Sequence, residues 1–406
     1  MTQPAGAANR VVAGDTVTTW ADLGSAPASF PQAAAFLTAN NEQAAHAVWA
    51  HVLDPGRETL IAARTRIGAE QETELREAGL SIIEGHDVTP ALTERPAEPG
   101  RIWLLTSGST GRPKQVAHTL DSLTTVSGQQ PPRTWLCPYA TGAYAWWQVV
   151  TLSLSLPGQD IVFVEPSELD SWPAKAEMYG VSAASGTPTF WRQAIFRSGE
   201  TMARLPLEQV TLGGEPVDQA ILDQLRELYP DARISWIYAS SEAGAAIAVH
   251  DGQAGFPRAW LDRDTPGRPR LSVDGEELLI ASSHAADGMD AVIRTGDRVE
   301  LTDDRVLITG RLASDEINVG GSKASAGKVR DVLLSHPGVA WAAVRGRKAP
   351  LVGNMVVAEV VLADGSQVSD QELVAYCAER LPDYSVPRRI RVLPQIPIKE
   401  SLKSDV

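Results

Sequence analysis

The stretch that decides the fold is RIWLLTSGSTGRPK, residues 101–114. Its apolar first part predicts a buried strand over residues 101–105. The loop that follows, TSGSTGRPK, contains two glycines, four hydroxyl side chains and a terminal lysine. Glycines let backbone N–H groups converge on one point, and the hydroxyls and the lysine add donors and positive charge. The loop therefore favours binding of an anion over an ordinary surface turn.

This loop differs from the two best-known phosphate-binding sequences. A Walker A loop needs Gly-Lys followed by Ser or Thr, and a dinucleotide fold needs GxGxxG. Neither pattern occurs in residues 106–114. The loop therefore indicates an anion site of another kind.

The composition of the whole chain limits its partners. Its 406 residues, 43% of them hydrophobic, suffice for one large domain and a smaller one. A net charge of −14 disfavours a nucleic-acid partner, because phosphate backbones attract basic surfaces. No stretch approaches the ~20 apolar residues of a membrane span, and the start, MTQPAGAANR, lacks the apolar core of a secretory signal. Because Cys137 and Cys377 are far apart, we expect a cytoplasmic protein without a disulfide framework. The oligomeric state stays open.

The periodicity of apolar residues predicts an α/β protein. We expect helices over residues 30–53 and 70–79 before the loop, and after it strands that alternate with helical patterns. The expected strands are 160–164, 209–214 and 233–240, with a helix over 218–230. Short strands joined by polar turns then indicate an antiparallel extension, over 275–282, 294–302 and 305–310.

The end of the chain predicts a separate α+β unit of about 95 residues. Its expected elements are a helix over 326–335, strands over 339–344 and 355–361, a helix over 370–381 and a strand over 390–393. We therefore expect a large layered α/β domain over residues 1–310 and a small mobile α+β domain over residues 311–406.

Seven segments together carry a family resemblance. In chain order they are TSGSTGRPK (106–114), LGGEP (212–216), YASSE (238–242), RTGD (294–297), GRLASDEINVGGSK (310–323), LPDYSVPRRI (381–390) and PIKESLK (397–403). They resemble, in the same order, the motifs of the adenylate-forming superfamily: acyl- and aryl-CoA synthetases, nonribosomal adenylation domains and luciferases. Each segment alone is a weak signal, but seven in order are a strong one.

The resemblance implies that a carboxylate attacks the α-phosphate of ATP, after which a thiol takes the acyl group from the adenylate. It implies ATP and Mg²⁺ as cofactors. The implied nucleotide-binding residues are Thr106, Ser107, Gly108, Ser109, Thr110, Gly111, Lys114, Gly213, Gly214, Glu215, Tyr238, Ala239, Ser240, Ser241, Asp297 and Arg311. The implied catalytic residues are Thr106, Lys114, Glu242 and Lys403.

Several of these residues have implied individual roles. The phosphate loop would hold the β- and γ-phosphates, and Glu242 would bind Mg²⁺, which prefers oxygen ligands. Asp297 would accept hydrogen bonds from the ribose with Arg311 assisting, and Tyr238 would stack on adenine against the backbone of residues 213–215. The plain alternatives are a solvated carboxylate for Glu242, a hairpin turn at Asp297 and a buried strand aromatic for Tyr238.

Lys403 matches the lysine of the last motif, which implies that it bridges the carboxylate and the α-phosphate. Lys399 and Lys323 are the fallback candidates. The sequence departs from the family in a short region before the phosphate loop, in Leu402 where glycine is usual, and in a chain that stops soon after Lys403. The hinge position is Ala313, where Asp or Lys is usual, so the pivot could instead be Ser314 or Asp315.

The acid pocket of this family follows the phosphate loop, here in CPYATGAYAWWQVV (137–150). Tyr139-Ala140 stands where amino-acid-activating members carry an aspartate, and a buried ammonium without a carboxylate costs several kcal/mol. An α-amino acid is therefore disfavoured. Rings there favour a flat aromatic acid, with packing in the core as the alternative. The expected pocket residues are Tyr139, Tyr144, Trp146, Trp147 and Gly214, and Phe190 and Trp191 carry the same ambiguity.

The resemblance leaves several acceptors open. Gly320 and Gly321 would line the path of a thiol, and CoA is the expected co-substrate, with RGRK (345–348) a candidate for its nucleotide end. A carrier-protein thiol is the close alternative, and activation of nitrite to diazotise an aryl amine is a third. A non-catalytic nucleotide binder is disfavoured because it needs no lysine at position 403.

Lys403→Ala is expected to abolish acid-dependent pyrophosphate release while the fold stays intact. The cation would stabilise charge only during adenylation, so turnover falls more than ATP affinity. Pyrophosphate release, nucleotide binding and thermal melting measure these effects, with Lys399→Ala as the matched control. Release by Lys403→Ala at near the parental rate would move the role to Lys399 or another lysine.

Overall fold

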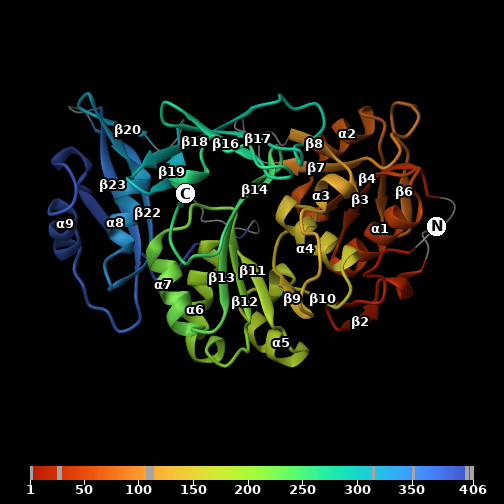
Figure 1. The fold of residues 1–406 in the computed structure, drawn as a ribbon, viewed down its shortest axis with the longest axis horizontal. Helices are drawn as coiled ribbons and strands as arrows, with labels where there is room; N and C mark the ends of the chain where they lie inside the picture. The colour runs from red at the N-terminus through yellow and green to blue at the C-terminus, as the bar shows by residue number, and fades with distance from the viewer. Residues whose placement is uncertain are drawn as a thin grey trace.

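The computed structural model describes residues 3–24, 30–106, 114–312, 316–349, 353–397 and 402. Its centre is a sheet whose inner strands pair in parallel, flanked by α4 (Tyr144–Ser155), α5 (Trp172–Tyr179), α6 (Pro188–Met202) and α7 (Gln219–Leu228) (Figure 1). The strand order is β14 (Gly244–Val249), β13 (Arg233–Ser240), β12 (Gln209–Gly213), β11 (Ala183–Gly186), β9 (Arg133–Cys137), β10 (Gln159–Phe163), β1 (Arg10–Ala13) and β2 (Thr16–Thr19). Only the outer pairs β13–β14 and β1–β2 are antiparallel within this described sheet. The predicted α/β class is confirmed.

A second sheet carries the phosphate-loop strands. Its strand order is β6 (Asp87–Thr89), β5 (Ser81–Glu84), β3 (Ala33–Thr38), β4 (Glu58–Ala63), β7 (Ile102–Thr106) and β8 (Lys114–His118). The helices of this region are α1 (Asn41–Leu53), α2 (Ala69–Glu77) and α3 (Leu120–Leu123).

The helix expected over residues 30–53 is wrong in its first half. Residues Ala33–Thr38 form β3, and every one of them is buried. Alanine favours helices in isolation, but pairing with β4 and β5 buries this apolar run on both faces, as is usual for parallel strands. The helix begins only at Asn41, where the Asn40 side chain accepts a hydrogen bond from Gln43 N at 3.0 Å.

The remaining sheets confirm the expected antiparallel extension and α+β unit. The extension has the order β15 (Phe256–Pro257), β19 (Arg305–Arg311), β18 (Ile293–Leu301), β17 (Glu277–Ala281) and β16 (Arg270–Asp274). The C-terminal sheet has the order β21 (Ser322–Ser325), β20 (Glu316–Val319), β23 (Gly353–Leu362) and β22 (Val339–Ala349), with β24 (Arg389–Val392) also paired to β23. Helices α8 (Ala326–Leu334) and α9 (Asp370–Ala378) pack against it. The short 3₁₀ helices are Ala21–Leu23, Arg64–Arg66, Pro166–Glu168, Arg258–Trp260 and Asp383–Ser385.

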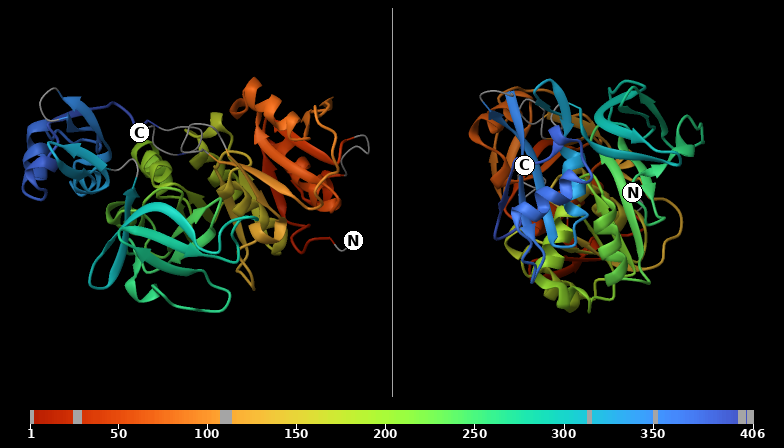
Figure 2. Two further views of the ribbon diagram at one scale, coloured as in Figure 1. Left: turned by 90° about the horizontal axis from the view of Figure 1, so that it is seen from above. Right: turned by 90° about the vertical axis from the view of Figure 1, so that its left-hand side faces the viewer.

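The C-terminal lobe, residues 316–397, encloses a hydrophobic core of its own, with Val329, Leu333, Val360 and Leu373 at its centre. It lies at the end of the molecule opposite the N-terminal sheet (Figure 2). Across the described residues, no helix is both long and apolar enough to cross a membrane.

Helix α6 contacts the C-terminal lobe. Phe196 of α6 packs against an apolar patch that includes Trp341. Arg192 of α6 forms an ion pair at 2.6 Å with Asp218, whose side chain also caps α7. Burial raises the pKa of Asp218, but the charge of Arg192, with that of Arg330 on α8 adding to it, holds this pKa below its ordinary value.

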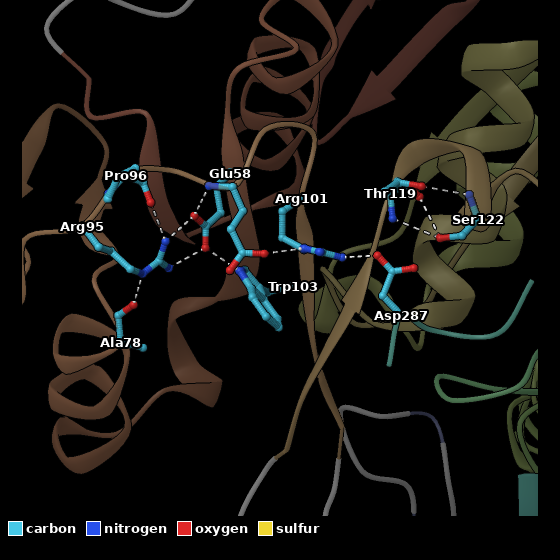
Figure 3. A network of polar contacts seen from close by, with 10 residues as sticks. Glu58, Ala78, Arg95, Pro96, Arg101, Trp103, Thr119, Ser122 and Asp287 are labelled. Atoms are coloured by element: carbon cyan, nitrogen blue, oxygen red, sulfur yellow. Dashed lines mark hydrogen bonds and ion pairs between the residues drawn. The ribbon is translucent and has the colours of Figure 1, made fainter. Parts of the chain in front are cut away.

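A buried carboxylate fixes the base of the phosphate-loop hairpin (Figure 3). Glu58, at the start of β4, is fully buried and accepts hydrogen bonds from Arg95 at 2.6 and 2.7 Å. It also accepts from Trp103 Nε1 on β7 at 2.7 Å and from the backbone of Glu98 at 2.8 Å. Burial raises the pKa of Glu58, but the hydrogen bonds from Arg95, Glu98 and Trp103 outweigh it and leave this pKa below its ordinary value of 4.5.

Glu58→Gln is expected to lower the free energy of unfolding by about 2–4 kcal/mol at neutral pH, because it leaves Arg95 without its anion. The lowered pKa means that the parent has this stabilisation in full above pH 4.5 and loses it as the pH falls through the folded-state value. The difference between variant and parent should therefore shrink below pH 4.5 in urea titrations.

The matched control is Glu98→Gln, which removes a half-exposed partner of Arg101 and should cost less than about 1 kcal/mol. Equal urea midpoints for Glu58→Gln and Glu98→Gln at neutral pH would contradict a structural role for the Glu58 carboxylate.

Candidate functional site

The candidate site lies where the parallel strands of the central sheet end. Neighbours β9, β11, β12 and β13 run in parallel, so their carboxyl ends meet at one edge, the usual ligand-binding edge of such sheets. The segments leaving these strands carry Tyr139 after β9, Thr187 after β11, Gly214 after β12 and Glu242 after β13. Motif residues that are distant in sequence therefore share this edge.

The β7–β8 hairpin carries both ends of the predicted phosphate loop. Thr106 and Lys114 pair directly across the hairpin, with Lys114 exposed. Ser107, Gly108, Ser109, Thr110 and Gly111 lie outside the described residues. The structure thus places both ends of the predicted phosphate loop opposite each other.

His118, the last residue of β8, ties this hairpin to the YASSE segment. Its Nε2 donates to the carbonyl of Ser241 at 2.7 Å, and its Nδ1 lies 2.9 Å from Ser122 Oγ. His118 is fully buried, and this burial lowers its pKa, which favours the neutral ring with its proton on Nε2.

A loop after β17 adds a second tie. Arg101, which precedes β7, forms an ion pair with Asp287 (Figure 3). The backbone N–H of Asp287 donates to Ala117 O of β8 at 3.0 Å, and that of Ala286 donates to Glu242 O at 2.9 Å. The main chain at Glu242 is therefore held in place.

The donor set at Glu242 fits a magnesium ion that is held largely by a phosphorylated ligand. Among the described residues, no group of three or more histidine, cysteine or acidic side chains could hold a metal ion. Mg²⁺ commonly uses one or two carboxylates and completes its shell with phosphate oxygens and water. A single half-buried carboxylate such as that of Glu242 meets the protein's part of that requirement.

Asp297 and Tyr238 are joined directly. The Tyr238 hydroxyl donates to Asp297 Oδ2, and Arg311 Nε lies 2.8 Å from Asp297 Oδ1. Burial and the charge of Asp297 raise the pKa of Tyr238, so its hydroxyl stays a donor. The hairpin-turn alternative for Asp297 is wrong, because residues 295–297 lie inside β18, where Gly296 has φ +70°. Stacking of Tyr238 on adenine stays a prediction.

The LGGEP segment leaves the sheet beside α6. Gly213 ends β12, and Gly214 has φ +83°, which a glycine adopts without strain. Glu215 then turns back, and its carboxylate accepts a hydrogen bond from Thr189 N in the first turn of α6 at 3.0 Å. Ala239 and Ser240 lie at the end of β13, where Ser240 Oγ accepts from Ala243 N at 2.9 Å.

The structure separates the four predicted pocket aromatics into two pairs. Trp146 and Trp147 are fully buried, and Trp146 stacks on Phe163 at 5.7 Å between ring centroids. These contacts favour the core alternative for both tryptophans over lining of an acid pocket. Tyr139 contacts Ser185 Oγ at 2.9 Å beside the strand ends, and the ring of Tyr144 lies 5.8 Å from that of His118.

Phe190 and Trp191 also belong to the core. Their rings lie 5.1 Å and 6.1 Å from that of Trp172, with Phe190 stacked and Trp191 edge-on. Both side chains are buried, so the core alternative is favoured for them too.

Gly320 and Gly321 form the two-residue turn between β20 and β21. Both have positive φ, +57° and +89°, which this kind of hairpin requires, so the turn alone explains both glycines. Their place on a thiol path stays a prediction. Lys323 is exposed and pairs with Glu316 at 2.9 Å. Ala313, Ser314, Asp315, Lys399 and Lys403 lie outside the described residues.

Sequence reasoning did not single out His118, Asp287 and Thr187. Each makes at least one contact with a segment more than a hundred residues away. The spacing of residues within a motif does not predict contacts between segments so far apart in the sequence.

Comparisons with known proteins show the family of this chain. The model of the family described as AMP-binding enzyme matches residues 31–281, and that of the AMP-binding enzyme C-terminal domain matches residues 328–403. Surfactin synthase subunit 1 of Bacillus subtilis is 28% identical over 74% of this chain and 10% of its own length. Feruloyl-CoA synthase of Amycolatopsis sp is 26% identical over 74% of this chain and 67% of its own.

A solved benzoate CoA ligase from Burkholderia xenovorans LB400 has the same fold, with a TM-score of 0.76 at 18% identity over 99% of this chain and 96% of that one. The chain spans less than half of the length of several curated relatives, among them 48% of a long-chain-fatty-acid–CoA ligase of Escherichia coli O157:H7. The first family model alone covers more than half of the 406 residues. The protein therefore belongs to the AMP-binding enzyme family, within the adenylate-forming superfamily that its seven motifs resemble.

Proposed function

We propose that this chain is an AMP-forming ligase that activates an aromatic carboxylic acid and transfers it to the thiol of CoA. The observation that carries the proposal is the junction of three motif segments by hydrogen bonds. His118 links the phosphate-loop hairpin to Ser241, and Tyr238 links the same strand end to Asp297. These contacts support a site in which groups suited to metal and ribose lie at one sheet edge, next to the hairpin that carries the ends of the phosphate loop.

The proposed chemistry has two steps. A carboxylate oxygen of the acid attacks the α-phosphorus of ATP, the bond to the bridging oxygen breaks, and pyrophosphate leaves. The CoA sulfur then attacks the acyl carbon, and AMP leaves. Positioning and charge neutralisation supply most of the catalysis in phosphoryl transfer.

Each group has a proposed part in the first step. Thr106, Lys114 and the loop between them would hold the outgoing pyrophosphate. Glu242 would hold Mg²⁺, which neutralises phosphate charge when bound. Asp297 would orient the ribose, and Lys403 would bridge the two reacting groups.

The two steps would use the two lobes differently. We place the boundary between residues 310 and 311 and the pivot at residues 313–315, with Gly320 and Gly321 on the thiol path of the second step. The rotation that this requires is an analogy with the family.

The proposal of an aromatic acid is supported by Tyr139 and by relatives. Position 140 is alanine, so the segment 139–140 offers no carboxylate to a substrate ammonium. Feruloyl-CoA synthase, 26% identical, and 2-succinylbenzoate–CoA ligase of Bacillus cytotoxicus, 25% identical, are named for aromatic acids.

Transfer to a carrier-protein thiol is the second candidate. It is favoured by similarity to surfactin synthase subunit 1 and to a dimodular nonribosomal peptide synthase of Bacillus subtilis, 28% and 27% identical. Consumption of free CoA together with AMP release distinguishes the two acceptors.

Pyrophosphate release across a panel of acids tests the proposal. The panel contains benzoate, anthranilate, 2-succinylbenzoate and ferulate, with palmitate and phenylalanine as controls of other classes. Release above the ATP-only background is expected with an aromatic acid and not with phenylalanine. Tight ATP binding without release for any acid would overturn the ligase proposal.

Asp297→Asn is expected to weaken AMP binding about tenfold or more, because a charge-assisted hydrogen bond to the ribose is lost. Calorimetric titration with AMP measures this without knowledge of the acid. The matched control is Asp303→Asn, an exposed aspartate just beyond the end of β18, which should bind AMP like the parent. Parental affinity in a folded Asp297→Asn variant would exclude the ribose role.

A further inference from the structure

Leu402 is a residue of the chain end that is buried in the large domain. It is fully buried and belongs to the main hydrophobic core, although the chain before it forms the C-terminal sheet. Its φ of +60° is uncommon for a residue with a side chain. Because that backbone conformation is strained, the contacts of Leu402 must outweigh the strain.

Thr187 supplies the polar part of these contacts. Its hydroxyl donates to the carbonyl of Leu402 and accepts from Phe190 N at 3.1 Å, so its proton and a lone pair are both used. Thr187 is only 1% exposed, which shields this hydrogen bond from water. Thr187 therefore holds the carbonyl group of Leu402, the residue that precedes Lys403 in the sequence.

The contact lies at the candidate site. Thr187 follows β11 at the edge where the parallel strands end, and Thr189 of the same turn donates to Glu215. Further along α6, Arg197 donates to Gln395 at 3.2 Å. Helix α6 and its capping residue therefore contact the C-terminal chain at Leu402 and at Gln395. Of the two contacts, the one at Leu402 lies beside the proposed nucleotide-binding segment.

The side chain at position 402 distinguishes this chain from the glycine that is usual there. Glycine would adopt φ +60° without strain but would bury no side chain. Leucine accepts the strain and adds a buried apolar side chain on the large domain. The substitution thus turns a permissive backbone position into an attachment point.

We propose that Thr187 and Leu402 form an anchor that positions the following residue, Lys403, for adenylation. Thr187 is then a positioning residue that acts through the chain end. The effect on catalysis rests on the proposed function of Lys403, whereas the anchor itself does not.

The anchor is tested by thiol labelling. Cys137 and Cys377 are fully buried, so Leu402→Cys places a reporter thiol in a protein whose own thiols are protected. Ellman's reagent should label it slowly. Adding Thr187→Val should raise the labelling rate about fivefold, the effect of one lost hydrogen bond, while Thr187→Ser keeps the hydroxyl and should stay within about twofold.

Two labelling results would overturn the anchor. One is fast labelling of Leu402→Cys in the presence of Thr187, and the other is an equal rise for Thr187→Val and Thr187→Ser. Thermal melting of each variant shows that α6, which Thr187 also caps, is still folded.

The positioning role is tested by kinetics with an acid that the pyrophosphate panel identifies. Thr187→Val should lower kcat for pyrophosphate release about five- to tenfold with the KM for ATP within about twofold, because an effect confined to the transition state lowers turnover. Thioester formation from preformed acyl-adenylate should be unchanged. An unchanged kcat would exclude positioning of Lys403 by Thr187. If no acid gives pyrophosphate, the proposed function fails, while labelling alone still decides whether the anchor exists.

Discussion

Parallel hydrogen bonding among β9, β11, β12 and β13 is the constraint on which the candidate site depends. Parallel strands cannot be joined by tight turns, so each is followed by a crossover segment that starts at the same edge. The groups proposed to bind the nucleotide can then come from remote parts of the sequence without any long loop. Were one strand reversed, its motif would emerge at the opposite edge, some five residues of strand away.

Buried polar groups hold the second sheet onto this edge. Glu58, which contacts Trp103 of β7, and His118, the last residue of β8, are both fully buried and hydrogen-bonded at the base of the hairpin. A buried polar group that lost its partner would cost more than the bond contributes, so these contacts specify one position of the hairpin rather than a range of positions. Hydrogen bonds lower the pKa of Glu58, so its carboxylate accepts as an anion, and burial lowers the pKa of His118, so its imidazole donates as a neutral ring.

Much of the fold could be predicted because strands and helices are marked by apolar periodicity and capping residues within a few neighbouring positions. Strands such as β13 and helices such as α7 follow from apolar periodicity and a capping residue, and the motif order identified the family. The helix predicted over residues Ala33–Thr38 was wrong, because alanine favours a helix in isolation but here lies in a strand that its neighbours bury. The sequence could not show whether Trp146 lines the acid pocket or packs in the core. A tryptophan that stacks on Phe163 and one that stacks on a ligand have the same sequence pattern.

Contacts between distant segments lay beyond prediction for a different reason. The bond from His118 to Ser241 joins residues 123 positions apart, and that from Thr187 to Leu402 joins residues 215 positions apart. Periodicity and turn chemistry describe at most a few neighbouring residues, whereas these pairs are set by the topology. Leu402, three residues after Lys399, stands in a polar stretch typical of a solvated tail, yet its side chain is buried.

The first turn of α6 has a consequence for energetics across the molecule. Thr187 contacts the chain end and Thr189 contacts Glu215 of the nucleotide segment, so one rigid turn touches both. Thermodynamic linkage between two such contacts is reciprocal: whatever free energy a nucleotide gains from a docked chain end, the docked chain end gains from the nucleotide. Docking of Leu402 and binding of the proposed nucleotide would, in that sense, stabilise each other equally.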